Sequence, residues 1–151
     1  MLKAATVLLT VVALFSLVVG IVYVVEGTLL PYHQEFIGMT MDEIAELNPD
    51  LATLAAIFIR VAGILFIGVG VLSIAVIHLA LRKAEAWAWW TILLGMGAIN
   101  GPLVAITWPV GGFPRMSAVI MLTMFVIAIV LAGRGVLGQA QPGPTASCKS
   151  S

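Results

Sequence analysis

Four long runs of apolar residues dominate this sequence, and each is long enough to cross a lipid bilayer as a helix. They cover residues 5–25, 61–81, 87–108 and 116–133. A transmembrane helix needs roughly 20 mainly apolar residues. Because lipid offers no hydrogen-bonding partners, each run must satisfy its own backbone groups, which favours helices over strands. The sequence therefore predicts an all-α fold, a bundle of four transmembrane helices within residues 1–134.

The low charge content supports a lipid environment. The chain is 62% hydrophobic and only 9% charged, whereas soluble domains carry about 25% charged residues. Its 151 residues fit a single domain. The formal net charge is zero and no basic run is present, so nucleic acid is not an expected partner. The first expected partner is the lipid bilayer.

The first apolar run also shares a feature with secretory signal peptides, because Lys3 lies just before it. The run is about 20 residues long, whereas the apolar region of a signal peptide has about 7–15. No A-x-A cleavage site follows it. We therefore expect a retained helix, with a cleaved signal peptide as the alternative.

The basic residues predict how the bundle is oriented. With four spans, Arg60 and Arg115 fall on one side of the membrane. The other basic residues fall on the opposite side, namely Lys3, Arg82, Lys83, Arg134 and Lys149. Basic residues accumulate on the cytoplasmic side of membrane proteins. We expect a multi-pass protein of the cell membrane with both termini in the cytoplasm and the connection of residues 26–50 outside.

Two helix-start signals lie in that first connection. Thr40 and Glu43 have the spacing of a capping box, in which each side chain accepts from the other residue's backbone amide. A short amphipathic helix is predicted over residues 41–47, where apolar residues recur along one edge. Asn48 is a good N-cap and Pro49 a good first helical residue. The second long helix should therefore begin at this point, well before the membrane.

Polar residues inside or beside the apolar runs are the candidates for a site, because such groups are costly in a membrane. Glu26 and Arg60 are expected at similar depth, where they could form an ion pair. Asn100 lies in the third run. One hypothesis is an outward-opening, ligand-binding pocket lined by these three residues, with Tyr23 and His33 at its rim. The alternative is an ion pair and an interhelical amide bond that only hold the helices together.

Small residues indicate where helices approach closely. Gly97 and Gly101 form a G-x-x-x-G pattern in the third run, and Ser16 and Gly20 have the same spacing in the first. Pro102 removes one backbone hydrogen bond and can kink the third helix. We interpret these four small residues as helix-packing positions.

Metal or redox chemistry finds little support in the sequence. The acidic residues of the first connection follow no EF-hand spacing, so capping and solubility explain them better than cation binding. His78 stands alone and is expected to bond a nearby carbonyl or a lipid headgroup at the inner interface. Cys148 is the only cysteine, which excludes an internal disulfide or a thiolate cluster built by one chain. We expect no metal site, no cofactor and no catalytic residue.

Residues 135–151 are predicted to form a disordered cytoplasmic tail, because Gly, Pro, Ser and Gln dominate them. The last four residues, beginning at Cys148, have the position of a prenylation box. The two residues after the cysteine are not aliphatic, as that motif requires. Lipidation of the tail is therefore not expected.

Three stretches carry a resemblance to a known class of protein. They are MTMDEIAELNPDL before the second helix, IRVAG near its membrane entry and RKAEAWAWW entering the third. Together they resemble small prokaryotic four-helix integral membrane proteins of unknown function, and more distantly DoxX-like proteins. The resemblance covers residues 5–134. It implies a four-helix membrane bundle and carries over no catalytic residue.

Three functions remain open from the sequence. The first is a structural or interaction bundle that forms homo-oligomers or binds a membrane-protein partner. The alternative is a ligand-binding or transport subunit that uses the outer polar residues. The least favoured is a membrane enzyme acting on lipid or quinone, because no nucleophile–base set, metal cluster or paired inward carboxylates appear.

Overall fold

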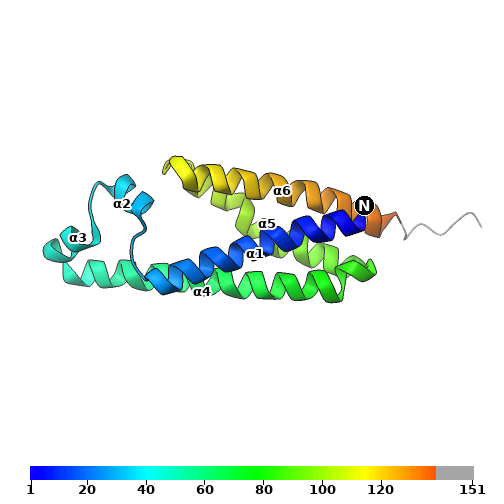
Figure 1. The fold of residues 1–151 in the computed structure, drawn as a ribbon, viewed down its shortest axis with the longest axis horizontal. Coiled ribbons are helices and arrows are strands. Elements are labelled where there is room, and N and C mark those ends of the chain that lie inside the picture. The colour runs from blue at the N-terminus through cyan, green and yellow to red at the C-terminus, as the bar shows by residue number, and fades with distance from the viewer. Residues whose placement is uncertain (139–151) are drawn as a thin grey trace, which may run out of the picture.

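The computed structural model describes residues 1–138, and in them the chain is all-α, as predicted (Figure 1). No strand occurs in these residues. Four helices there are long and apolar enough to cross a membrane. The elements, in chain order, are α1 (Leu2–Glu26), α2 (Pro31–Ile37), α3 (Met41–Leu47), α4 (Pro49–Leu79), the 3₁₀ turn η1 (Leu81–Lys83), α5 (Ala86–Thr107) and α6 (Gly112–Leu137).

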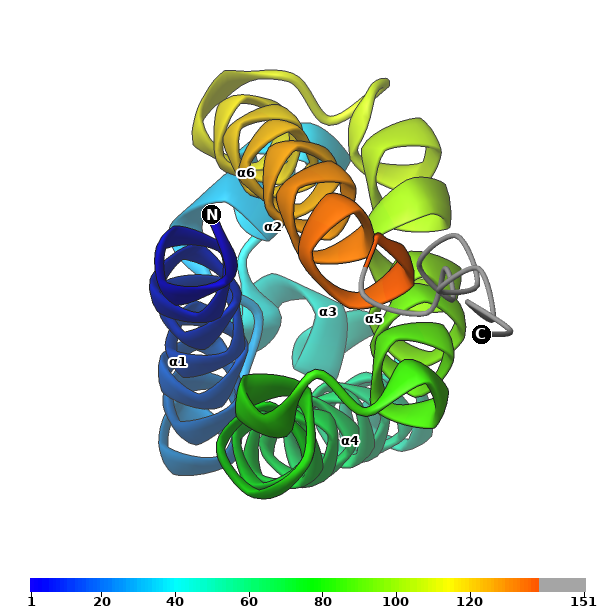
Figure 2. The same cartoon turned by 90° about the vertical axis from the view of Figure 1, so that its right-hand side faces the viewer.

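The four long helices form one bundle, as expected of a multi-pass membrane protein. Viewed end-on, they follow each other around the bundle in the order α1, α4, α5, α6 (Figure 2). The contact between α1 and α4 is the most extensive. We call the end where α1 begins and α6 ends the terminal end, and the end that carries α2 and α3 the distal end (Figure 1).

The predicted short helix is present at the distal end, and its bounds follow from its capping. The Thr40 side chain accepts from the Glu43 amide at 3.2 Å, and the Thr40 amide donates to the Glu43 carboxylate at 2.7 Å. The Thr40 amide, and after it the Thr40 hydroxyl that donates to the same carboxylate oxygen, lower the pKa of Glu43. The Asn48 side chain accepts from the amides of Asp50 and Leu51, which starts α4 directly after α3.

Helix α2 is an additional element that the sequence interpretation did not include. Pro31 is its first residue, and Gly38 ends it in the left-handed conformation with φ 75°. Proline at the first position and glycine just past the last are the usual pair of helix-end signals. This element carries Tyr32 and His33.

Helix α4 extends past the other helices at the distal end (Figure 1). Its 31 residues span about 46 Å at 1.5 Å per residue, more than the roughly 30 Å of a hydrocarbon core. Ile44 of α3 packs with Ala52 and Ile59 of α4 and with Leu29 in a small buried cluster. One side of the extension is therefore covered by the chain itself.

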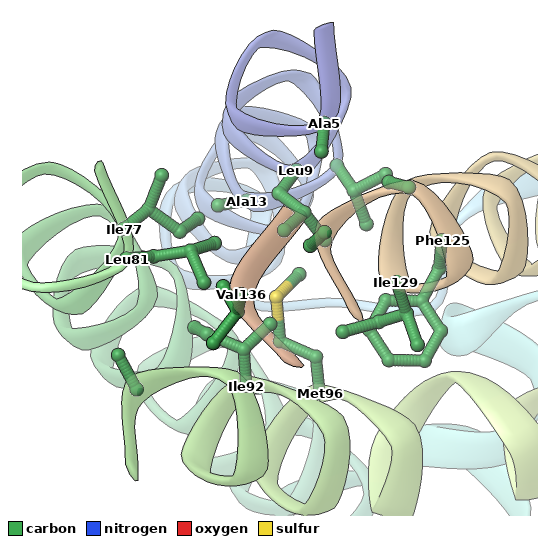
Figure 3. Close-up of a cluster of buried hydrophobic side chains, with 14 of the residues drawn as sticks. Ala5, Leu9, Ala13, Ile77, Leu81, Ile92, Met96, Phe125, Ile129 and Val136 are labelled. Carbon is green, nitrogen blue, oxygen red and sulfur yellow. The ribbon is translucent and has the colours of Figure 1, made fainter. Parts of the chain in front are cut away.

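The main core lies towards the terminal end of the bundle. Leu9 of α1, Ile77 of α4, Met96 of α5 and Phe125 of α6 belong to one buried cluster, and Figure 3 shows their side chains converging between the helices. Most of its other members are alanine or aliphatic residues. The helices are thus held together most tightly at the end opposite to α2 and α3.

Helix α6 is longer at both ends than the predicted span of residues 116–133. Its first turn includes Pro114, which is tolerated there because the first helical amides have no intrahelical partner. At the other end Val136 is buried, and a Cβ on Gly135 would lie 3.3 Å from the Cβ of Leu2. The helix therefore continues into the segment predicted as tail, because that turn packs against α1. The remainder of the predicted tail, with Cys148, lies outside the described residues.

Candidate functional site

A pocket of about 110 Å³ lies between the four long helices in the distal half of the bundle. Each helix contributes to its wall, with Tyr23 from α1, Phe66 from α4, Asn100 from α5 and Ser117 from α6. Tyr32 of the short helix α2 completes the wall at the distal end. The described residues that line this pocket include no charged side chain.

Asn100 is the most deeply buried polar residue of the pocket, with 6% of its surface exposed. Its side-chain amide Nδ2 donates to the Met96 carbonyl at 2.9 Å, one turn earlier in α5. This contact fixes the amide orientation, because only the nitrogen can donate. The side-chain oxygen Oδ1 therefore faces the other way and accepts no hydrogen bond from residues 1–138.

The accessibility of the Asn100 side-chain oxygen indicates which space it borders. Among the described residues no fully enclosed side-chain nitrogen or oxygen lacks a hydrogen-bond partner. The Asn100 oxygen must therefore border accessible space, and the space that Asn100 lines is the pocket. The pocket thus offers one free, deeply placed hydrogen-bond acceptor.

Two tyrosine hydroxyls supply the second polar feature. The hydroxyl of Tyr23 lies 2.7 Å from that of Tyr32, so one of them donates to the other. Burial, followed by the hydrogen bond to Tyr23, raises the pKa of Tyr32 above its ordinary value of 10.0. The Tyr32 hydroxyl therefore stays neutral at physiological pH. One hydroxyl proton of the pair is left for a further partner.

The remaining hydroxyl groups of the wall are bonded within their own helices. Ser16 donates to Val12, Thr107 to Leu103 and Ser117 to Pro114, each through the backbone carbonyl. These hydroxyl groups therefore offer few free hydrogen-bonding positions to the pocket. Its surface is therefore mainly apolar and aromatic, with polarity concentrated at Asn100 and the tyrosine pair.

His33 lies beside the pocket and not in its wall. Its ring centroid is 4.2 Å from that of Tyr32 and 6.0 Å from that of Tyr23. Its Nδ1 accepts from the Leu30 amide at 3.2 Å, which caps the start of α2. Burial lowers the pKa of His33 from 6.5, in keeping with a neutral ring that accepts this hydrogen bond. His33 thus helps to hold Tyr32 over the pocket.

Glu26 and Arg60 lie away from this pocket, in contrast to the predicted outward site. Both side chains are exposed. The Arg60 guanidinium covers Gly27, where a Cβ would come 2.5 Å from its Nε. No ion pair joins Glu26 to Arg60 among the described residues. Of the five predicted site residues, the structure brings Tyr23, Asn100 and His33 together.

The four predicted packing residues occupy four different environments. Gly20 lies where α1 crosses α4, and a Cβ there would come 2.6 Å from the Gly63 carbonyl oxygen. A Cβ on Gly97 would meet the Phe125 ring of α6 at 3.6 Å. Gly101 is exposed with open space around it, and Ser16 lines the pocket.

Tyr32, Thr107 and Ser117 are pocket residues that the sequence interpretation did not select. Thr107 is the last residue of α5 and Ser117 lies in the second turn of α6, and neither hydroxyl residue carries a particular signal in the sequence. Tyr32 could have been noticed through the Pro31 and Gly38 signals that bound its helix. Its contact with Tyr23 depends on how α2 folds back over the bundle.

Comparisons of the chain with protein-family models, with curated proteins and with solved structures give no match. The pocket with Asn100 and the tyrosine pair is therefore the feature from which a function can be inferred.

Proposed function

We propose that this chain is a multi-pass membrane protein that binds a small, uncharged and mainly apolar molecule in the pocket of its distal half. The observation that carries the proposal is the free oxygen of the buried Asn100 in a pocket without charged side chains. Polar groups in a membrane interior are costly and mark functional positions. A ligand with a hydroxyl or amide donor would satisfy the Asn100 oxygen, and the free tyrosine hydroxyl would donate to the same ligand.

The pocket volume limits the ligand to at most about one six-membered ring. The volume is about 110 Å³, while an engineered apolar cavity of about 150 Å³ accommodates benzene. The rings of Phe15, Phe66 and Phe113 line the same space and suit a flat or aliphatic ligand. A charged ligand is disfavoured, because no counter-charge lines the described wall.

Thermal unfolding of the detergent-solubilised protein with phenol, benzene and benzoate tests this proposal. Phenol should stabilise most, since its hydroxyl donates to Asn100, and at a hundred times Kd the gain is about 2.7 kcal/mol. Benzene should stabilise less, and benzoate should have no effect. In Asn100→Leu the advantage of phenol over benzene should vanish. Equal stabilisation by all three compounds, or an undiminished phenol effect in the variant, contradicts the proposal.

A second candidate is a structural or interaction bundle that associates with copies of itself or with a membrane-protein partner. The observation that favours it is the distal extension of α4, where Leu51, Leu54, Ile57 and Phe58 are all about half exposed or more. Native mass spectrometry of the purified chain tests it. A discrete dimer that Phe58→Gln converts to monomer supports association, and a monomer at all concentrations contradicts it.

The proposal also includes the orientation of the chain in the membrane and its relationship to a known class of proteins. Lys3, Arg82, Lys83 and Arg134 lie around the terminal end, which supports a cytoplasmic location in the cell membrane for that end. Arg60 and Arg115 belong to the distal half. The four long apolar helices are compatible with a DoxX-like relationship, which we retain as a hypothesis.

A further inference from the structure

A second hollow lies on the opposite half of the molecule, between α1 and the end of α4. It is a groove of about 630 Å³ lined by Leu2, Lys3, Thr6, Val7, His78 and Arg82. The side chains of Lys3, His78 and Arg82 are exposed. The groove shares no residue with the distal pocket, so binding in the groove is independent of the proposed function.

A chain of polar contacts crosses the groove and orients its basic side chains. The Thr10 hydroxyl donates to the Thr6 carbonyl at 2.7 Å, so its oxygen is left to accept from Nε2 of His78 at 3.2 Å. The other ring nitrogen of His78, Nδ1, then carries the lone pair and faces Nη1 of Arg82 at 3.5 Å. His78 therefore links α1 to Arg82 and holds the guanidinium beside the groove.

The positive charge of the groove has no acidic partner among its lining residues. Glu85 is the only acidic residue of the sequence after Asp50. It lies in a separate hollow with Lys83 and Trp87. Lys3 and Arg82 are thus two neighbouring cations at a helix–helix groove near the membrane surface, where an anion would satisfy them.

An apolar surface continues from the groove along α1. Val7 is 62% exposed, and Val11 and Leu14 follow at helical spacing on the same face with 41% and 46% exposed. In a membrane these side chains contact acyl chains. A ligand that fits both parts carries a phosphate next to hydrocarbon chains.

We propose that the groove binds the phosphate of one anionic phospholipid at the terminal face of the membrane. Lys3 and Arg82 contact the phosphate oxygens, His78 and Thr10 position Arg82, and the acyl chains lie along Val7 and Val11. Basic pockets between transmembrane helices are known to accept such headgroups. A soluble phosphate shares the headgroup chemistry but gains nothing from the apolar face.

The test is native mass spectrometry of the full chain in detergent, titrated with phosphatidylglycerol or with phosphatidylcholine. We expect one phosphatidylglycerol retained and phosphatidylcholine bound at least tenfold more weakly. The double variant Lys3→Gln, Arg82→Gln should weaken phosphatidylglycerol binding about thirtyfold, since each basic residue near a headgroup contributes about fivefold.

The control variant Lys83→Gln, Arg134→Gln removes the same charge from the same end of the bundle but leaves the groove intact. It should bind phosphatidylglycerol within twofold of the unaltered protein. Equal weakening in both double variants, or release of the lipid by millimolar inorganic phosphate, overturns the proposal. If the groove double variant no longer melts cooperatively, Lys3→Gln alone takes its place, with about fivefold weaker binding expected and no change overturning the proposal.

Discussion

Asn100 combines two properties that rarely occur together in a membrane interior. Its surface is almost fully buried, and its side-chain oxygen still accepts no hydrogen bond from the described residues. That oxygen borders the pocket, and an acceptor without a partner in a mainly apolar pocket that holds no donor costs about 1–3 kcal/mol. A polar side chain with such a cost is expected where it has a role that a leucine of similar size could not perform.

The first prediction concerns the stability of the ligand-free protein after Asn100→Leu. The substitution removes the unpaired oxygen from a mainly apolar pocket, so we expect the free energy of unfolding to rise by about 1 kcal/mol. Chemical denaturation in detergent measures it. Thr123→Val is the control, because Thr123 is exposed and its hydroxyl bonds only its own helix, so its effect should be near zero. A loss of more than 1 kcal/mol in Asn100→Leu would show that the amide has a structural role.

A site residue could be predicted from the sequence only where its neighbours in the chain make it conspicuous. Asn100 and Tyr23 are polar or amphipathic residues in or beside an apolar run, and there a single such residue is conspicuous. Tyr32 lies among polar residues of a connection and gains its role only through the hydroxyl 2.7 Å away on α1. Glu26 and Arg60 were expected to pair by depth alone, but depth does not determine the direction in which a side chain points.

At the scale of elements, the crossing of α1 and α4 depends on glycines in both helices. A Cβ on Gly20 would lie 2.6 Å from the Gly63 carbonyl oxygen, and one on Gly63 would lie 2.8 Å from the Gly20 carbonyl oxygen. Both contacts are with backbone atoms, which cannot rotate away as a side chain can. The two helices approach each other closely only because neither residue has a side chain.

The second prediction is that Gly20→Ala destabilises the bundle by about 1–3 kcal/mol, since the helices must separate to admit the methyl group. Gly68→Ala is the matched control on α4, because a Cβ there meets nothing within 4 Å. It should be neutral or stabilise by up to about 1 kcal/mol, owing to the better helix propensity of alanine. Guanidinium denaturation followed by circular dichroism compares the two. Equal effects would mean that the crossing is not tight.

Helix α2 is the element through which pH should act on the pocket. The pKa of His33 is lower in the fold than its ordinary 6.5 because of burial. Its neutral ring therefore stabilises the fold above about pH 6.5, and the contribution is lost as the pH falls through the lowered pKa. Protonation converts Nδ1 from an acceptor into a donor, and the Leu30 amide then loses its partner.

The third prediction is that α2 loosens in mild acid and takes Tyr32 away from Tyr23. NMR of tyrosine ring protons in micelles should show the Tyr32 signal shift towards that of an exposed ring between pH 7 and pH 5. His33→Gln should remove this dependence, since glutamine at the same position can accept from the Leu30 amide without titrating. An identical pH response in the variant would assign the change to another group.

The elements were predictable where the signals are local. Thr40 with Glu43 and Asn48 with Asp50 set the starts of α3 and α4, because each pair lies only two or three positions apart. The sequence interpretation did not include helix α2, although Pro31 and Gly38 mark its two ends. Its seven residues lack the apolar periodicity that a longer helix shows. The end of α6 was placed too early, because its last turn is stabilised by packing against Leu2 at the far end of the chain.

At the scale of the whole molecule, the bundle is divided into a packed half and an open half. The main buried cluster, whose side chains Figure 3 shows, lies towards the terminal end. The pocket lies towards the distal end. The length and apolar character of the four runs predicted a four-helix membrane bundle. The order of the helices around it and the pocket between them could not be predicted, because both arise from contacts between residues far apart in the sequence.

The last prediction concerns how this bundle lies in the membrane. If the excess of basic residues at the terminal end determines orientation, both chain termini are cytoplasmic and α3 is outside. Cys148 is the only cysteine and reports on the C-terminal side without any substitution. A membrane-impermeant maleimide should leave it unlabelled in intact cells and label it after permeabilisation. In a Cys148→Ser background, Glu46→Cys on exposed α3 should react in intact cells. The reverse pattern would place the distal pocket on the cytoplasmic side, and labelling of both cysteines in intact cells would be incompatible with four membrane-spanning helices.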